Sequence, residues 1–234
     1  MKAPNVRILW VGLQFLSAAL PAQTYTPNPV GYVNMSYAEP DTLIGNPLNS
    51  GSNTLNEVFP DTLNPHIPDG TTISTWDAGM SRFQPPSTYH IGIGWDIDYL
   101  LPPGEGALLH ATAPFVNMFV GSVLYEPGTD VAPLTPPARS AGLYLLSSLS
   151  PRDSRTFEDI IGRPPLEGEY VMSLGVPSQT YVKTTFQNGD WNNGVPMLNI
   201  GQAAFFNLVP EPNSTVLVCL ALATASVFWR FSRR

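Results

Sequence analysis

This chain of 234 residues has a single cysteine, Cys219, which lies in an apolar stretch near the C-terminus. One cysteine excludes an internal disulfide and any metal cluster built on several thiolates. Charged residues make up only 12% of the chain, against about 25% in ordinary soluble domains. Long surface helices stabilised by Glu–Lys pairs are therefore not expected. The apolar fraction of 43% is enough to offset ordering entropy, so we expect the chain to fold.

Basic residues are also scarce, with 11 against 18 acidic residues and a formal net charge of −7. Five of the basic residues lie in the two terminal segments, at Lys2, Arg7, Arg230, Arg233 and Arg234. The body between these segments is therefore even more acidic. Phosphate backbones attract the opposite sign of charge, so nucleic acid is excluded as an expected partner.

Motifs that carry chemistry are missing from the sequence. It has no His-Glu-x-x-His helix, no Gly-x-Ser-x-Gly elbow and no phosphate loop. Gly92-Ile-Gly94 and Gly104-Glu-Gly106 lack the third glycine of a nucleotide loop and are interpreted as turns. The three histidines, His66, His90 and His110, are far apart. We expect no catalytic residue, no metal site and no cofactor.

Asp96 and Asp98 are two residues apart, a spacing that can place two carboxylates on one strand face. Such oxygens suit calcium, but a complete site needs about six or more ligands. Asn192 and Asn193 keep oxygens at matching positions later in the chain. Solvated turn acids are the favoured interpretation, and weak calcium binding stays open.

The N-terminus has the three parts of a secretory signal peptide, over residues 1–22. Lys2 and Arg7 come first, an apolar stretch follows from Ile8 to Leu20, and small residues end at Ala22. We predict cleavage between Ala22 and Gln23. Cleavage after Ala19 and an uncleaved membrane anchor are the alternatives.

The C-terminus predicts a short transmembrane helix over residues 215–229, a stretch without charge. At 1.5 Å per residue the helix would be about 22 Å long, short of the roughly 30 Å hydrocarbon core. Arg230, Arg233 and Arg234 follow directly and are expected to stop the chain on the cytoplasmic side of the inner membrane. A buried terminal helix is the alternative.

Residues 209–234 resemble the PEP-CTERM sorting segment of Gram-negative bacteria, in which a Pro-Glu-Pro motif precedes an apolar helix and a basic end. The motif here is Val209, Pro210, Glu211 and Pro212. The resemblance implies recognition by an exosortase, a membrane cysteine protease of transpeptidase type. It also implies release or attachment at the surface of an exopolysaccharide-producing cell. Proline cannot join the following helix, so the motif should stay extended, as a protease requires.

The body is expected to contain one unit twice, over residues 23–130 and 131–208. An alignment pairs Leu48 with Leu149 and Thr54 with Thr156. Thr54-x-x-Glu57 and Thr156-x-x-Asp159 both match a capping box, so each unit should begin one short helix there. Pro60 and Gly162 should end these helices. Further pairs are Trp95 with Trp191, Gly104 with Gly201, and Leu108 and Leu109 with Phe205 and Phe206.

Alternating side chains and turn signals predict a mainly β fold, with each repeat forming a small sandwich or barrel with one short helix. A strand is expected from Thr71 to Trp76, with a turn at Asp77 to Gly79. Asn188-Gly189 is a strong turn signal after the alternating stretch around Tyr181. Residues 131–140 are interpreted as a linker. The repeats, together with Val30 to Asn34 (VGYVN), resemble β-rich modules of secreted bacterial surface proteins.

Aromatic residues are the candidates for ligand contact, because a flat apolar ring with a polar edge suits a sugar. Trp76, Tyr89, Tyr99 and Tyr181 are the predicted glycan contacts, with a core role as the alternative for Trp76. Trp95 and Trp191 recur at matching points, which favours packing.

Taken together, these features predict a secreted cell-surface or extracellular-matrix protein without catalytic activity, first anchored in the inner membrane and then processed. Its expected partners are an exosortase-type protease, the inner membrane and an exopolysaccharide. A carbohydrate-binding module for the producer's own polysaccharide is the alternative, and a small hydrolase of undetected type is a third.

Overall fold

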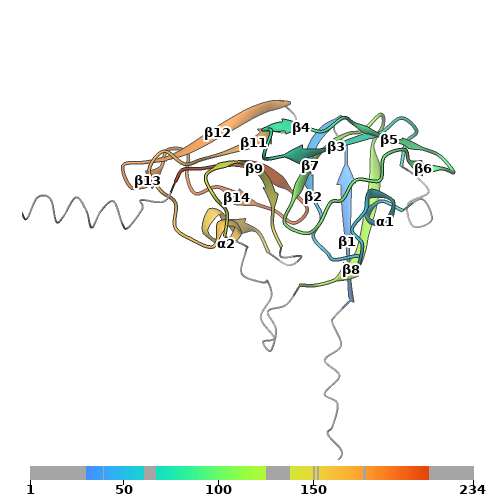
Figure 1. Ribbon diagram of the computed structural model, residues 1–234, viewed down its shortest axis with the longest axis horizontal. Helices are drawn as coiled ribbons and strands as arrows, with labels where there is room; N and C mark the ends of the chain where they lie inside the picture. The colour runs from blue at the N-terminus through green and yellow to red at the C-terminus, as the bar shows by residue number, and fades with distance from the viewer. Residues whose placement is uncertain are drawn as a thin grey trace, which may run out of the picture.

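The computed structural model describes residues 30–38, 40–60, 67–124, 138–149, 151, 153–175 and 178–210. Strands dominate these residues and only two short helices occur (Figure 1), so the prediction of a mainly β fold is confirmed. The helices are α1 (Leu55–Val58) and α2 (Phe157–Ile161). The strands are β1 (Val30–Tyr37), β2 (Asp41–Gly45), β3 (Thr72–Asp77), β4 (Arg82–Phe83), β5 (Ser87–His90), β6 (Gly94–Trp95), β7 (Gly106–His110), β8 (Phe115–Ser122), β9 (Gly142–Ser147), β10 (Arg155–Thr156), β11 (Tyr170–Gly175), β12 (Thr180–Gln187), β13 (Asp190–Trp191), β14 (Met197–Leu198) and β15 (Ala203–Leu208).

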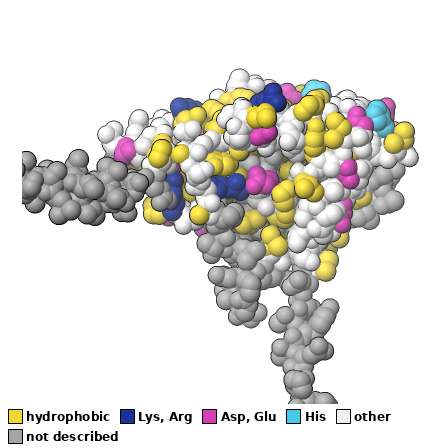
Figure 2. All heavy atoms as spheres, viewed as in Figure 1, with side chains coloured by type: hydrophobic (Ala, Val, Ile, Leu, Met, Phe, Trp, Pro, Cys, Tyr) yellow, Lys and Arg dark blue, Asp and Glu magenta, His cyan; other side chains and the backbone are white. Residues whose placement is uncertain are grey.

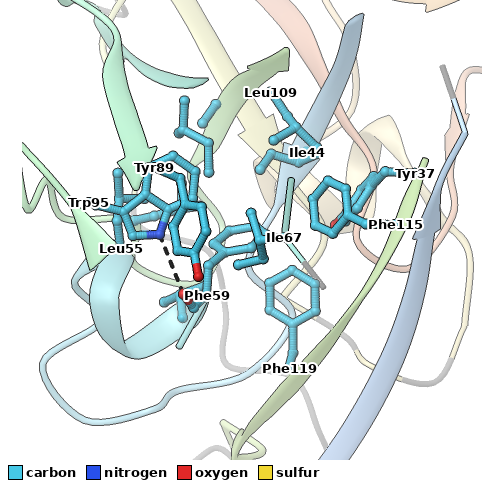
Figure 3. Packing of buried hydrophobic residues seen from close by; sticks show 14 of the residues in the cluster. Tyr37, Ile44, Leu55, Phe59, Ile67, Tyr89, Trp95, Leu109, Phe115 and Phe119 are labelled. Carbon is cyan, nitrogen blue, oxygen red and sulfur yellow. Dashed lines mark hydrogen bonds between the residues drawn. The ribbon is translucent and has the colours of Figure 1, made fainter. Parts of the chain in front are cut away.

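The first half, residues 30–124, is built on a six-stranded sheet in the order β2-β7-β3-β5-β6, with β4 paired to β3. A separate two-stranded ribbon of β1 and β8 supplies a second layer (Figure 1). The core lies between them, and Figure 3 shows Phe59 and Phe119 meeting in its middle, with ring centroids 5.4 Å apart. Alternation in β1 and β8 directs every second side chain into this core.

The second half, residues 138–210, is built on a five-stranded sheet in the order β13-β12-β11-β15-β9. Helix α2 buries Phe157, Ile160 and Ile161 against this sheet. The small pair β10 and β14 lies beside the helix. A core separate from that of the first half results, centred on Phe157, Trp191 and Phe206.

The two sheets have corresponding strand orders. The strands of the first sheet, in the order β2, β7, β3, β5 and β6, correspond to β9, β15, β11, β12 and β13 of the second. The two strands of each such pair have the same position in the strand order of their sheets and the same place in the order along the chain. The turns also correspond. Gly70 N–H donates to the Tyr89 carbonyl over 3.0 Å, and Gly168 N–H donates to the Phe186 carbonyl over 3.0 Å. Both glycines have positive φ, at +78° and +88°, which favours residues without a Cβ.

Both predicted helices are present, but only one has the predicted cap. Thr156 and Asp159 form a complete capping box at α2, and Gly162 ends that helix at φ +81°. The capping box predicted at Thr54 is wrong, because the Thr54 side chain makes no cap hydrogen bond. The Glu57 carboxylate instead accepts from the Ser52 hydroxyl over 2.6 Å and the Asn53 N–H over 2.7 Å.

The predicted hairpins agree with the structure. Trp76 pairs with Phe83 across the turn that follows β3. Asn188 and Gly189 join β12 to β13 with φ of +54° and +79°. The Glu167 carboxylate stabilises this second turn by accepting from the N–H groups of both turn residues over 3.0 and 2.8 Å.

Several predictions fall on residues outside the described ranges. They include the signal peptide with Ala22 and Gln23, the boundary at 130/131, Glu211 and Pro212, the helix over 215–229, and Arg230, Arg233 and Arg234. Within the described ranges, no helix is long and apolar enough to cross a membrane.

Candidate functional site: the junction of the two sheets

The two halves meet through a reciprocal pair of backbone hydrogen bonds. Gly45 N–H donates to the Gly201 carbonyl over 2.9 Å, and Ser147 N–H donates to the Gly104 carbonyl over 3.0 Å. Gly45 ends β2 and Ser147 ends β9, while Gly104 and Gly201 precede β7 and β15. Each bond therefore repeats the other with the roles of the two halves exchanged, which is the pattern of a two-fold interface.

Small residues allow this close approach. A Cβ on Gly45 would overlap the Cβ of Ser147, and a Cβ on Gly106 would lie 2.7 Å from that of Ala203. The two close pairs, Gly45 with Ser147 and Gly106 with Ala203, each join residues at equivalent positions of the two sheets. In the first sheet Gly45 of β2 lies opposite Gly106 of β7, and in the second Ser147 of β9 lies opposite Ala203 of β15. The space admits a Cβ on only one side of each pair, and in both pairs the residue with the Cβ, Ser147 or Ala203, belongs to the second half.

An aromatic cluster continues the junction on the side of β3, β4 and β12. The buried Phe205 ring has its centroid 4.8 Å from Trp76, 5.9 Å from Phe83 and 5.9 Å from Tyr181. Trp76 Nε1–H donates to the Leu143 carbonyl in the second half over 2.9 Å. The cluster therefore joins the halves by apolar contact and by a partly buried hydrogen bond.

Tyr181 lies at the exposed rim of this cluster, with 48% of its surface exposed. Partial burial, and to a lesser extent the charge of Asp41, raise the pKa of the Tyr181 phenol above its ordinary value. Asp41 belongs to the first half, and its carbonyl also accepts from Gln179 Nε2 over 3.2 Å. The residue directly before β12 thus bonds to the first residue of β2.

A surface hollow of about 580 Å³ lies next to the junction, beside Trp76. Its apolar lining includes Trp76, Tyr99 and Leu100, and its polar lining includes Gln84, Asp98 and Glu105. This volume falls in the range of small-molecule sites, roughly 300–1,000 Å³. The hollow presents ring and aliphatic surface together with amide and carboxylate groups.

Two of the polar lining groups are already positioned by neighbours. The Glu105 carboxylate accepts from the Arg139 guanidinium over 2.8 Å, and the Asp98 carboxylate accepts from the Asn56 N–H over 2.9 Å.

Figure 2 shows acidic and histidine side chains gathered mainly over the first half, on the right of that view, and basic side chains over the centre and left. The Arg139–Glu105 pair crosses this division of charge.

The predicted glycan contacts do not form one site. Trp76 and Tyr99 line the hollow together, whereas Tyr181 is not among its lining residues and packs on the Phe205 ring, which also packs on Trp76. The prediction for Tyr89 is wrong, because Tyr89 is only 1% exposed and packs 5.5 Å from Trp95 in the core (Figure 3). Trp95 and Trp191 are buried, in agreement with the packing role predicted for them.

Asp96 and Asp98 accept hydrogen bonds from different backbone N–H groups, those of Thr88 and Asn56. Asp96 Oδ1 accepts from the Thr88 N–H over 2.7 Å and from the Ser87 hydroxyl over 3.0 Å. These bonds, with the Thr88 N–H first, lower the pKa of Asp96 against the opposing effect of desolvation. Asn192 repeats the role, accepting from the Thr185 N–H over 2.9 Å.

Candidate metal ligands do not gather in the described ranges, where no three His, Cys, Asp or Glu side chains are placed to hold an ion. His110 Nδ1 lies 2.7 Å from the Asp41 carboxylate, and His90 Nδ1 lies 4.0 Å from that of Asp69. These are two separate pairs at the surface. His66 lies outside the described residues.

A buried carboxylate holds the end of the described fold, and sequence analysis did not single it out. Glu169 is fully buried and binds the Arg163 guanidinium through two hydrogen bonds of 2.6 and 3.0 Å. Its oxygens also accept from the Leu166 N–H over 2.8 Å and the Val209 N–H over 3.0 Å. Val209 and Pro210 of the predicted sorting motif follow β15 directly at this point. The sequence signal that could have indicated this buried carboxylate is the position of Glu169 directly before the apolar strand β11.

Comparison with protein-family models, curated proteins and solved structures finds no match to this chain.

Proposed function

We propose that this chain is a secreted cell-surface or extracellular-matrix protein without catalytic activity, structural or adhesive in an exopolysaccharide matrix, and processed by an exosortase-type membrane protease. The observation that carries the proposal is the position of the Pro-Glu-Pro motif. Strand β15 ends at Leu208, Glu169 holds the Val209 N–H, and the motif starts at the exposed Pro210. A cut in the motif would therefore leave both cores intact.

We also propose that the two halves are copies of one unit, joined as a scaffold. The matching strand orders, the matching turns at Gly70 and Gly168, and the reciprocal bonds of Gly45 and Ser147 support the duplication. Such a body gives a rigid core with two similar ends. It suits a structural or adhesive role without requiring a reaction.

Processing is tested by measuring the mass of the chain in producing cells with and without the exosortase-type protease. We expect loss of the segment from the motif onward only where the protease is present. The matched control replaces Pro210 and Pro212 by alanine, which should preserve the full-length tail in both strains. A tail of unchanged length in all strains would refute the proposal.

The hollow beside Trp76 favours a second candidate function, binding of the producer's own polysaccharide. Trp76 and Tyr99 supply ring surface in one hollow, and the side-chain amide of Gln84, whose Oε1 accepts from the Thr75 hydroxyl over 3.0 Å, lines the same hollow. Glycan arrays with the Tyr99→Ala chain test this function. The matched control is Tyr32→Ala, which removes an aromatic that is 73% exposed on β1, away from the hollow. Binding that both variants retain, or no binding by the parent chain, would refute it.

A further inference from the structure

Strand β1 has one edge without a paired strand among the residues that the structure describes. In the part of the chain that the structure describes, β8 is the one strand paired with β1, through a continuous register from Val30↔Ser122 to Tyr37↔Phe115. The eight residues of β1 (VGYVNMSY) contain no charge and no proline, and the register contains no bulge. Edge strands of natural monomers commonly carry one of these three features, which block pairing with another chain.

Strand β12 of the second half shows the contrast, because β13 pairs only with its last two residues, Phe186 and Gln187, and the described residues place no strand beside the rest of its outer side. Strand β12 carries Lys183 in its middle. Two side-chain amides also bind backbone groups of this strand. Asn192 Oδ1 accepts from the Thr185 N–H over 2.9 Å, and Asn193 Nδ2 donates to the Lys183 carbonyl over 3.2 Å. Among the described residues, the chain therefore protects the outer side of β12 and leaves that of β1 without a partner.

The outward face of the ribbon is apolar as well. Val30 and Tyr32 on β1 are 74% and 73% exposed, and Val116 and Val120 on β8 are 50% and 38% exposed. Strand β8 is also free of charge. The chain as a whole has a net charge of −7, so two copies repel one another at long range. The two strands of the ribbon add no charge of their own to this repulsion.

We propose that β1 pairs antiparallel with β1 of a second copy of this chain, joining two ribbons into one four-stranded sheet around a two-fold axis. A two-fold axis makes an edge complementary to itself, so a single surface serves both partners. Backbone hydrogen bonds supply the attraction and alternate side chains set the register, as in other cases of strand addition. This proposal does not depend on processing or on glycan binding.

The register follows from the pleat. Opposite residues of an antiparallel pair point to the same face, so the axis must pass through a residue for the exposed set to stay exposed. An axis at Asn34 pairs residues 31–37 of the two strands and places Tyr32 opposite the small Ser36. The two Asn34 amides then face each other as donor and acceptor.

The first test measures the mass of the full-length chain by sedimentation in density-matched detergent. We expect a dimer for the parent chain and its loss in Tyr32→Lys/Asn34→Lys, which places like charges across the axis. The matched control is Val116→Lys/Val120→Lys, which adds the same charge to the same face but on β8, away from the edge. It should remain a dimer. A monomeric parent chain, or a dimer lost only in the β8 variant, would overturn the proposal.

The second test does not require the lysine variant to fold. In a Cys219→Ser chain, Asn34→Cys should form a disulfide-linked dimer under mild oxidation, because opposite Cα atoms in such a pair lie about 4.5–5.5 Å apart. Val182→Cys on the protected strand β12 is the control and should stay uncrosslinked. Equal cross-linking of the two variants, or a link from residue 34 to a different protein, would contradict self-pairing.

Discussion

Gly45 and Ser147 lie back to back where the two sheets meet, so close that a Cβ on Gly45 would overlap the Cβ of Ser147. Around them, the Ser147 hydroxyl donates to the Glu105 carbonyl over 3.1 Å, and the Gln202 carbonyl lies 3.5 Å from the place that a Cβ of Gly45 would occupy. Glu105 and Gln202 hold corresponding positions, one residue before Gly106 and Ala203. The space between the two strands can therefore hold one serine side chain, at position 45 or at position 147.

Exchange of these residues should be tolerated where a single change is not. Gly45→Ser should lower the free energy of unfolding by about 1–3 kcal/mol through overpacking. The exchanged chain Gly45→Ser/Ser147→Gly should recover most of that loss, because the new hydroxyl can donate to the Gln202 carbonyl. Urea denaturation of the single and double variants measures this coupling. If the double variant is as unstable as the sum of the two single ones, the two residues do not share one space.

Glu169 should be the most sensitive carboxylate of the second half. Glu169→Gln keeps the shape of the side chain but removes the charge that faces the Arg163 guanidinium, so we expect a loss of about 3–5 kcal/mol in unfolding free energy. Glu167→Gln is the matched control, an exposed acid two residues away that binds the turn at Asn188 and Gly189. Chemical denaturation compares the two variants. A similar loss in both would mean that burial of the Arg163–Glu169 pair is not decisive.

The two helix caps should differ in strength. Thr156→Ala removes a hydroxyl that accepts from the Asp159 N–H in a complete capping box, and should cost about 0.5–2 kcal/mol. Thr54→Ala removes a hydroxyl with no cap bond, so its effect should be clearly smaller. Thermal unfolding of both variants provides the comparison, and a larger effect at Thr54 would contradict the cap geometry.

Local signals in the sequence identify much of this fold. The turn at Asn188-Gly189 and the stop at Gly162 depend on positive φ, a requirement of the local backbone. Alternation likewise predicts strands correctly because the pleat has a period of two residues. The capping pattern is correct at Thr156 but wrong at Thr54, where the Glu57 carboxylate accepts from Ser52 and Asn53 instead.

Contacts between distant segments are not visible in the sequence. Nothing local indicates that β1 pairs with β8 or that Glu169 binds the Val209 N–H. Tyr89 has the composition of a sugar contact, and only packing against Trp95 shows that it is buried. The sequence alignment pairs Leu48 with Leu149, an offset of 101 residues between the two units. The strand pairing instead matches Gly45 with Ser147, an offset of 102 residues, so the alignment is wrong by one residue here.

Asp96 should be replaceable by asparagine. Asn192 accepts from Thr185 as Asp96 accepts from Thr88, so Asp96→Asn should preserve the strand-end bond while Asp96→Ala should lose it. Amide hydrogen exchange at the Thr88 N–H measures this difference. Calcium titration of the parent chain by calorimetry tests the alternative role, and a heat of binding that Asp96→Asn removes would make Asp96 a calcium ligand.

The acid sensitivity of the first half should depend partly on Glu57. The Ser52 hydroxyl is the largest influence and, with the Asn53 N–H, lowers the pKa of Glu57 below its ordinary value of 4.5, against desolvation. A lowered pKa contributes stability that is present above the ordinary value and is lost as the pH falls through the folded-state pKa. Glu57→Gln should therefore be less stable than the parent chain at pH 6, and the difference should shrink as the pH falls below 4.5. Urea midpoints across this range measure the difference, with the exposed Glu158→Gln as control. A gap that stays constant or widens in acid would show that the hydrogen bonds of Glu57 do not favour its charged form.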